Sequence, residues 1–589
     1  MAMFKGLSFL LRYSWKFNKR YVFYIFSLQI VSSLLPLLNI IVPKFIIDEL
    51  MGEKRVEFIV FYVGVLLCYN LIGGLAVTLL RGKSFTSKNK VFCKFQSMIA
   101  KKLSLCDFCN LEDPDFLNIK EQAGKFLYAN GQGFGMVLDS AVNIIGKLFV
   151  FAGIVAVIST LNIFIVIIFV VLVLLNAVVE TKVRKNYVKW DMEKAPIERK
   201  TAYFLNLVEN FAFGKEIRIF NLSQWLVGKI ESHLEIADKF YQKQTADYNK
   251  ASYFSTITGF VRDIVSYIYL CVRVIGGSIG IGDFTMYLSA IAQFNSAMNE
   301  VMQSIVTIKQ FSMYYDALDK YMNVPATMRA GTQKLPAGEH YCIAFADVSF
   351  KYPKAENYAL KSINIKLYPG EKLSVVGENG AGKTTFVKLL CRLYDPTDGK
   401  ILLNGVDIRN IEYDEYMSIL ATVFQDYKLL SFSIKDNIAF GEADNIPDAD
   451  VEELLCEAGL EQKISSLDAG IHTNIYKNFE ADGFEPSGGE GQKICIARAM
   501  YKDAHIIVLD EPTSALDPKA EYELYQKFHN MVQGRTAIFV SHRLSISKLC
   551  DKIAVFSDGS IVEYGSHDEL MEHNGMYAEF FNLQSQYYL

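Results

Sequence analysis

Long apolar runs alternate with polar stretches through the first half of the chain. The runs cover residues 21–42, 58–80, 137–161, 163–179, 254–275 and 287–310. At roughly 1.5 Å per helical residue, runs of this length can cross a hydrocarbon core about 30 Å thick. Longer polar stretches, residues 81–135 and 180–250, separate successive pairs of runs. The pattern therefore predicts a membrane domain over residues 21–320, with six transmembrane helices in three hairpins.

Lysine and arginine orient these predicted helices. They crowd the two long polar stretches as Arg81, Lys83, Lys88, Lys90, Lys94, Lys182, Arg184, Lys185 and Lys189, and are missing from the tips of the second and third hairpins. Because basic loops stay on the cytoplasmic side, both stretches, both termini and the second half of the chain are predicted to be cytoplasmic, in a multi-pass protein of the cell membrane. Residues 1–20 are basic and amphipathic, which predicts an elbow segment on the membrane surface, with a solvated tail as the alternative.

Polar side chains within the apolar runs mark either a translocation path, or helix ends at the membrane interface and internal ion pairing, because all of these keep them away from lipid. The third run contains Asp139 and Lys147, the fifth Arg262, Asp263 and Arg273, and the sixth Gln293, Asn299, Glu300 and Gln303. Gln293, Glu300 and Gln303 fall on roughly one helical face. The sequence leaves both interpretations open for the sixth run.

The second half of the chain has a different pattern. Residues 321–340 are rich in proline and glycine without an apolar period, which predicts a linker. Residues 341–589 alternate short apolar runs with helical patterns, which predicts an α/β domain with a mostly parallel sheet. Its strands are expected near residues 373–376, 506–509, 536–540 and 553–556.

A glycine loop follows the first of these strands and precedes a helical pattern. It consists of Gly377, Glu378, Asn379, Gly380, Ala381, Gly382, Lys383, Thr384 and Thr385. A strand, a glycine loop and a helix start form a cradle of backbone N–H groups for phosphate. Lys383 is suited to the β- and γ-phosphates and the Thr384 hydroxyl to Mg²⁺. This stretch predicts a P-loop domain that binds a nucleoside triphosphate with Mg²⁺, and ATP is the nucleotide expected on the cytoplasmic side.

Further candidate residues follow other strands. Asp510 and Glu511 end an apolar run, where α/β domains place ligands, so Asp510 suits a Mg²⁺ site and Glu511 a base for the attacking water. Residues 541–543 (Ser-His-Arg) follow another run, and His542 could hold a γ-phosphate or be a bystander. Ser487 begins a second helix N-terminus after Pro486. One nucleotide hardly needs two cradles from one domain, which favours two copies in a two-fold pair.

Together these residues resemble the ATP-binding cassette (ABC) transporter family over almost the whole chain, as an exporter-type half-transporter. By motif position, the resemblance assigns Tyr352 to adenine stacking, residues 377–385 to Walker A, Gln425 to the Q-loop and to Mg²⁺, Ser487, Gly488 and Gly489 to the signature, Asp510 and Glu511 to Walker B, Asp517 to the D-loop and His542 to the switch histidine. It implies catalytic roles for Glu511, His542 and Lys383 and metal roles for Thr384, Gln425 and Asp510. Short coupling helices are expected near residues 113–120 and 211–220.

The signature departs from the usual family pattern. Pro486 and Glu490 stand where Leu and Gln are usual, and Lys493 stands where Arg is common. A carboxylate beside a nucleotide phosphate would repel it unless it points away. The resemblance therefore leaves a homodimer and a heterodimer with a second half-transporter equally open.

The resemblance implies a type I exporter fold and an ATPase that drives export of a peptide, a lipid or an amphiphilic small molecule, with the substrate itself unknown. An exporter-fold importer and an ATP-gated channel or regulatory receptor are the alternatives. The net charge of −4 gives no reason to expect nucleic acid, and the six apolar runs argue against a soluble ATPase acting on it. Ten scattered cysteines, with Cys106 and Cys109 the close pair, are predicted to be reduced structural thiols.

Overall fold

The computed structural model describes residues 2–128, 133–159, 163–210, 213–338, 340–511, 532, 534–541, 544 and 546–586. The chain forms two compact units. The helical unit comprises Met1–Ser104 and Pro114–Val324, and the α/β unit comprises Leu105–Asp113 and Pro325–Leu589. Nine residues between two helices of the first unit therefore belong to the second, which the sequence pattern did not indicate.

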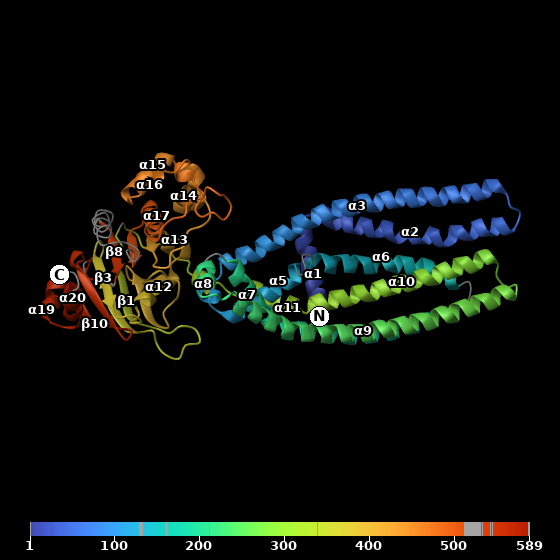
Figure 1. Ribbon diagram of the computed structural model, residues 1–589, viewed down its shortest axis with the longest axis horizontal. Coiled ribbons are helices and arrows are strands. Elements are labelled where there is room, and N and C mark those ends of the chain that lie inside the picture. The colour runs from blue at the N-terminus through green and yellow to red at the C-terminus, as the bar shows by residue number, and fades with distance from the viewer. Residues whose placement is uncertain are drawn as a thin grey trace. The chain divides into compact units, whose positions relative to one another are not determined.

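The helical unit is built from long helices lying side by side (Figure 1). Its helices are α1 (Ala2–Phe17), α2 (Lys19–Met51), α3 (Val56–Ser104), α5 (Pro114–Tyr128), α6 (Gly133–Ser159), α7 (Ile163–Glu209), α8 (Gly214–Ile219), α9 (Ser223–Ile275), α10 (Ile281–Ser312) and α11 (Tyr315–Asn323). Five predicted spans lie in α2, α3, α7, α9 and α10, and residues 137–159 of the third predicted span lie in α6. Packing joins α10 to α6 and α2, α2 to α3, and α7 to α9.

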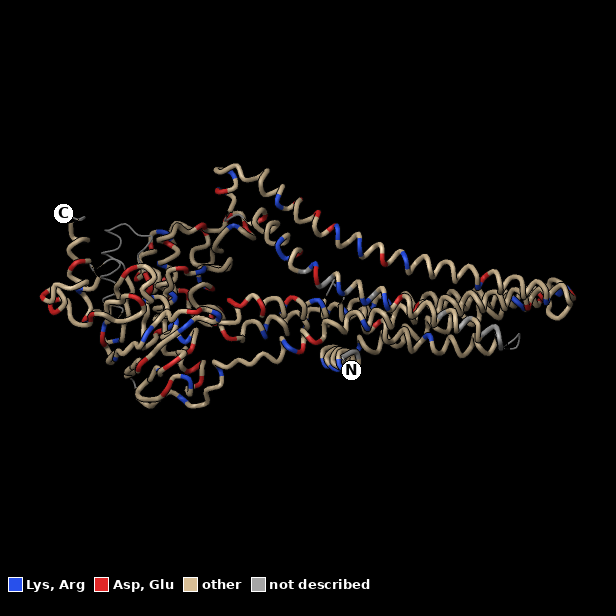
Figure 2. Tube along the Cα trace, turned by 90° about the horizontal axis from the view of Figure 1, so that it is seen from below, with Lys and Arg blue, Asp and Glu red and all other residues tan. Residues whose placement is uncertain are grey.

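Within the described residues, three helical segments are long and apolar enough to cross a membrane. They are Lys19–Met51, Val56–Ser104 and Gly133–Val157. At most 22% of each apolar window is buried, so these helices leave broad apolar faces for lipid. Charged residues are sparse along long stretches of the helices (Figure 2). Crossing by α7, α9 and α10 stays a prediction, as does membrane contact by α1, which buries Leu10 and Ser14 in the unit.

Ion pairing, between helices or within one helix, accounts for several polar residues of the predicted spans. Lys88 lies 3.1 Å from Asp139, joining α3 to α6, and Lys147 lies 2.9 Å from Glu300, joining α6 to α10. Arg262 and Asp263 form an ion pair with each other. For these residues the structure favours the pairing interpretation over the translocation path.

The α/β unit contains two sheets. The first has the order β2-β1-β4-β5, and its neighbouring strands are antiparallel: β1 (Ile343–Phe350), β2 (Leu360–Leu367), β4 (Asp398–Leu403) and β5 (Val406–Asp407). The second has the order β10-β9-β3-β8-β7-β6 and consists of β3 (Lys372–Gly377), β6 (Leu420–Val423), β7 (Ile506–Asp510), β8 (Thr536–Val540), β9 (Lys552–Ser557) and β10 (Ser560–Gly565). Its strands from β9 to β6 are parallel and β10 is antiparallel, which confirms the four predicted strands and the mostly parallel sheet.

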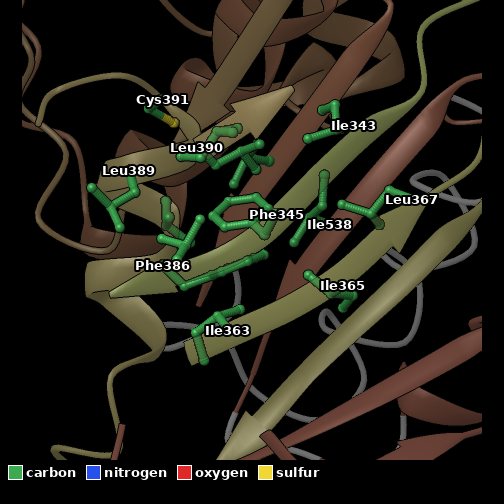
Figure 3. Close-up of a cluster of buried hydrophobic side chains, with 14 of the residues drawn as sticks. Ile343, Phe345, Ile363, Ile365, Leu367, Phe386, Leu389, Leu390, Cys391 and Ile538 are labelled. Atoms are coloured by element: carbon green, nitrogen blue, oxygen red, sulfur yellow. The ribbon is translucent and has the colours of Figure 1, made fainter. Parts of the chain in front are cut away.

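Helices surround these sheets: α12 (Lys383–Leu390), α13 (Tyr413–Ser418), α14 (Ile434–Ala439), α15 (Asp448–Glu457), α16 (Glu461–Ser465), α17 (Gly488–Tyr501), α19 (His567–Glu572) and α20 (Met576–Gln586). The main core lies where α12 meets both sheets (Figure 3). The ring of Phe386 on α12 lies 4.6 Å from Phe345 of β1 and 5.5 Å from Phe556 of β9, measured between ring centres. This packing fixes the start of α12, and with it the glycine loop.

The short helix α4 (Phe108–Leu111) lies in the α/β unit. It ends before residues 113–120, where the first coupling helix is predicted, and residues 114–120 of that range form the start of α5 in the helical unit. Of the second predicted range, residues 211–212 lie outside the described part of the chain, and the remainder contains α8. The described parts of both predicted ranges are thus largely helical, and their role as coupling helices stays a prediction.

Candidate functional site

The glycine loop between β3 and α12 has the geometry of a phosphate cradle. Gly377, Gly380 and Gly382 have φ values of 147°, 82° and 103°, which glycine adopts without strain. A Cβ on Gly377 would lie 2.3 Å from the backbone oxygen of Phe556 in the neighbouring strand β9. Strand pairing therefore leaves no room for a side chain at the first glycine. Glu378, Asn379 and Gly380 are exposed at the tip of the loop.

Lys383 lies in the first turn of α12 and is buried. Its ammonium donates to the backbone oxygens of Gly377 and Glu378, each at 2.8 Å. Burial lowers the pKa of Lys383, and Glu511 and Asp510 oppose that shift. A partly desolvated ammonium that contacts neutral carbonyls can exchange them for phosphate oxygens, with which it interacts more strongly.

Asp510 and Glu511 follow each other at the carboxyl end of β7. Asp510 is buried, and burial together with the neighbouring Glu511 raises its pKa to about 6, although Lys383 opposes the shift. Glu511 has a φ of 50° and its N–H donates to the backbone oxygen of Val540 at 2.8 Å. Asp510 is thus the last residue of the buried strand, and Glu511 lies in a bend directly after it.

Gln425, which follows β6, belongs to the same site. Its side-chain amide donates to Oε2 of Glu511 at 2.7 Å. Carboxylate and amide oxygens, with the exposed hydroxyl of Thr384, are the hard oxygen ligands that Mg²⁺ prefers. Asp510, Gln425 and Thr384 are therefore chemically suited to hold Mg²⁺, and the raised pKa of Asp510 matches a buried carboxylate that gains from a nearby cation.

The signature begins α17 with Ser487 as its N-cap, as predicted. Glu490 closes a capping box: its Oε2 accepts from the N–H of Ser487 at 2.8 Å and from the hydroxyl at 2.7 Å. Burial raises the pKa of Glu490, but these hydrogen bonds and the lysines at 463 and 493 outweigh it, so the pKa is lowered. The carboxylate is turned onto the start of its own helix, and it stays charged there.

Two side chains link these motifs, and the sequence did not indicate either role. The hydroxyl of Tyr427, two residues after Gln425, donates to the backbone oxygen of Gly488 at 2.7 Å. The buried amide of Gln492 donates to the backbone oxygen of Glu511 at 3.2 Å. The Q-loop and the signature helix therefore both contact the carboxylate region. Their positions just after recognised motifs are the only sequence signal for them.

Tyr352 lies after β1 and is half-buried. Its hydroxyl lies 3.1 Å from the hydroxyl oxygen of Thr385, and its ring packs against Phe350 and Tyr394 with centres 4.9 Å and 5.4 Å away. The contact with Thr385 places the ring beside the start of α12. Stacking on adenine remains a prediction for this ring.

Two predicted site residues, Asp517 and His542, lie outside the described residues. Leu544, two positions later in the sequence than His542, donates its N–H to the side-chain oxygen of Gln584 on α20 at 2.9 Å. The roles of Asp517 and His542 stay predictions.

Comparisons with known proteins agree on one family. Residues 360–514 match the family described as ABC transporter. The chain is similar to the subtilin transport ATP-binding protein SpaT of Bacillus subtilis, with 32% identity over 67% of this chain and 64% of SpaT, somewhat less than two thirds of it. It is similar to the nisin transport ATP-binding protein NisT of Lactococcus lactis subsp. lactis, with 25% identity over 97% of this chain and 95% of NisT. A solved bacterial Atm1-family ABC exporter with ATP bound shares the fold, with a TM-score of 0.81 and 20% identity over 96% of this chain and 98% of that chain.

Proposed function

Starting from a chain that carries the nucleotide-binding domain of the ABC transporter family fused to a membrane domain, we propose that it is the ATPase half of an exporter in the cytoplasmic membrane. The observation that carries this is the cradle formed by Gly377 and Lys383 beside the carboxyl end of β7, where Asp510 and Glu511 lie. Helices of membrane-spanning length in the same chain supply the path to which hydrolysis would be coupled.

The proposal gives each of the predicted site residues a role. The loop N–H groups and Lys383 would hold the phosphates, and Glu511, steadied by Gln425, would accept the proton of the attacking water. Mg²⁺, held by Asp510, Thr384 and Gln425, would neutralise phosphate charge. His542 would stabilise the γ-phosphate, and Tyr352 would stack on adenine.

A second chain completes the site in this proposal. The N-terminus of α17 exposes Ser487 and Gly488, which the cradle of the same chain does not use. A two-fold pair would place this helix start over the phosphates held by the partner, with the Asp517 loop beside it. The partner is either a second copy of this chain or another half-transporter.

Replacing Glu490 with glutamine is expected to lower the KM for ATP about two- to fivefold. Glutamine keeps the capping box but removes a negative charge at the helix start, which would lie near the partner-bound phosphate in the proposed pair, an effect of about 0.5–1 kcal/mol at a partly exposed site. Steady-state ATP hydrolysis by the full chain in lipid measures it.

The control is Glu490→Ala, which removes the charge together with the two hydrogen bonds that the carboxylate accepts from Ser487. It should lower the melting temperature, since a lost hydrogen bond of this kind costs about 1 kcal/mol. An unchanged KM in the glutamine variant would mean that the charge of Glu490 has no effect on ATP binding.

A polar cavity in the helical unit supports the cargo side of the proposal. Side chains of α7, α9 and α10 line a cavity of about 240 Å³, including Asn176, Ser252, Asn299 and Gln303. Gln303 of α10 donates to Glu180 of α7 at 3.0 Å, so this residue also pairs between helices. For Asn299, which lines the cavity, we favour the translocation-path interpretation, and amide and hydroxyl groups suit a hydrogen-bonding cargo such as a peptide.

Asn299→Leu is expected to raise the cargo concentration for half-maximal uptake about three- to tenfold, because one cargo hydrogen bond is worth roughly 1 kcal/mol. Uptake into inside-out vesicles measures it. Thr78→Leu, the same kind of change on the exposed surface of α3, is the control and should behave as wild type. Equal effects of the two variants would mean that the cavity does not bind the cargo.

The proposed function is tested by ATP-driven accumulation in sealed inside-out vesicles that contain the full chain. Labelled subtilin or nisin is the first cargo, because the relatives SpaT and NisT are named for these peptides. A labelled lipid and an amphiphilic dye are the other two arms. Accumulation that requires MgATP supports export; loss of preloaded cargo would indicate import, and hydrolysis without movement of any cargo would favour a regulatory ATPase.

A further inference from the structure

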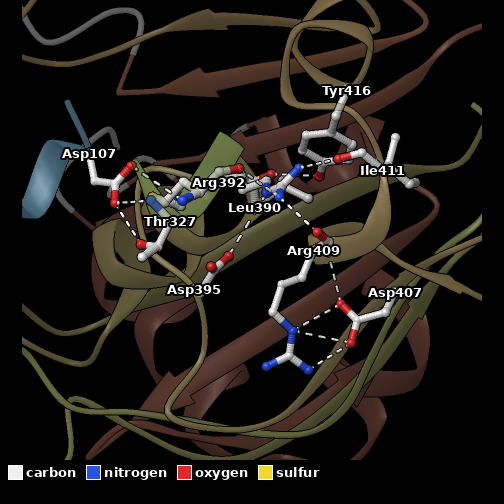
Figure 4. Close-up of polar contacts among 10 residues, drawn as sticks. Asp107, Thr327, Leu390, Arg392, Asp395, Asp407, Arg409, Ile411 and Tyr416 are labelled. Carbon is white, nitrogen blue, oxygen red and sulfur yellow. Dashed lines mark hydrogen bonds and ion pairs between the residues drawn. The ribbon is translucent and has the colours of Figure 1, made fainter. Parts of the chain in front are cut away.

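The Leu105–Asp113 segment is fastened to the α/β unit at its N-terminal end by Asp107 (Figure 4). This buried carboxylate accepts from the N–H and the hydroxyl of Thr327, at 2.8 Å and 2.6 Å, and from the N–H of Met328 at 3.3 Å. The backbone oxygen of Met328 accepts in turn from the buried guanidinium of Arg392 at 2.9 Å. Arg392 follows α12, so this end of the segment is tied to the helix that begins at the phosphate cradle.

The C-terminal end of the segment is held by two carboxylates. Glu112 accepts from the hydroxyl of Tyr394 and lies 3.6 Å from the ammonium of Lys388 on α12. Asp113 accepts from Lys354 at 2.8 Å. Burial, and then the hydrogen bond to Glu112, raises the pKa of Tyr394, which keeps its phenol a donor.

Aromatic rings surround the ammonium of Lys388. It lies 5.4 Å from the centre of the Tyr352 ring and 5.8 Å from the centres of the Tyr394 and Phe108 rings. Tyr394 packs edge-on against both other rings, with centres 5.4 Å from Tyr352 and 5.8 Å from Phe108. One cation therefore touches the predicted base-stacking ring, a ring of the segment, and the segment's carboxylate Glu112.

We propose that Glu112 and Lys388 form a positioning pair, which sets the Tyr352 ring for the nucleotide base and makes base binding and the docking of Leu105–Asp113 depend on each other. The proposal rests on the proposed nucleotide site. Any displacement of Glu112 moves the ion that contacts Tyr352, and coupling between two binding events acts equally in both directions. Because Leu105–Asp113 lies in sequence between α3 and α5 of the helical unit, the pair connects base occupancy to the membrane domain.

Two features distinguish this pair from an ordinary surface ion pair, which is worth little. The Lys388 side chain is only 24% exposed, and its contact with the rings adds a cation–π attraction that water screens weakly. The ion pair between Asp113 and Lys354 also joins the Leu105–Asp113 segment to the rest of the α/β unit, but the Lys354 side chain is 63% exposed. It serves as the matched control.

The experiment compares two ligands of the full chain in lipid nanodiscs by calorimetry: ATP, and inorganic tripolyphosphate, which has the phosphates without the base. Glu112→Gln and Lys388→Met are each expected to weaken ATP binding about three- to tenfold. Tripolyphosphate binding should stay within about twofold of wild type. The double variant should bind ATP no more weakly than the single variant with the lower ATP affinity. Lys388→Arg should restore ATP binding and Asp113→Asn should leave it unchanged.

A general structural defect would weaken both ligands equally, and that result would overturn the proposal. Unchanged ATP binding in both variants would overturn it as well, as would a wild type that binds ATP no better than tripolyphosphate. A wild type that binds neither ligand would instead contradict the proposed nucleotide site itself. The two failures are therefore distinguishable.

Discussion

The Glu511→Gln variant of the full chain, purified into lipid, is expected to hydrolyse MgATP at least about a hundredfold more slowly than wild type. Glutamine preserves the volume and can still accept the hydrogen bond from Gln425, but it cannot take a proton from water. Glutamate and glutamine adopt the φ of 50° at position 511 equally well, so the substitution does not change the backbone there. ATP binding should therefore persist, and the loss should fall on kcat.

Phosphate release measures this turnover, with the mass of the particle determined in the same preparation. Glu442→Gln is the control, because it makes the same chemical change at an exposed position that contacts Tyr501 away from the phosphate cradle. If a particle of two identical chains hydrolyses ATP and the Glu511→Gln substitution abolishes that turnover, the chain works as a homodimer. A wild-type chain that does not hydrolyse ATP would point to a missing partner chain. A Glu511→Gln variant that still hydrolyses ATP would show that Glu511 is not the base.

Local patterns predicted the elements that form the catalytic edge. The buried strands β3, β7, β8 and β9 read as continuous apolar runs because both of their faces are covered, and Ser487 precedes α17 as a recognisable cap. The antiparallel sheet was not predicted, since strands such as β2 are buried on one face only and their alternation is broken by register shifts. The sequence pattern therefore predicted these four strands, which are buried on both faces, but not the strands that are buried on one face.

Contacts between distant segments were not readable from the residues. The hydrogen bond between Gln425 and Glu511 joins residues 86 positions apart, and only the family resemblance suggested that both serve one site. The attachment of Asp107 to Thr327 spans 220 positions and has no local signal. The orientation of Glu490 was likewise undetermined, because a carboxylate at that position can face a phosphate or close its own helix start, and the structure shows the second.

The first glycine of the cradle offers the second large effect: Gly377→Ala is expected to weaken ATP binding more than about thirtyfold. Gly377 pairs with Phe556 in the neighbouring strand, and the new methyl group would lie 2.3 Å from that backbone oxygen. Relieving the overlap means displacing either β9 or the loop, at a cost of about 2–4 kcal/mol.

Gly380→Ala separates this overlap from the strain of a positive φ alone. Gly380 has a φ of 82° and nothing within 4 Å of the added methyl group, so alanine there costs only about 1–2 kcal/mol of backbone strain. Calorimetric titration of both variants with ATP is expected to show a much weaker affinity for Gly377→Ala than for Gly380→Ala. Equal affinities would mean that the cradle adapts as a flexible loop, and then the pairing of β3 with β9 could not be what fixes the phosphate-binding N–H groups.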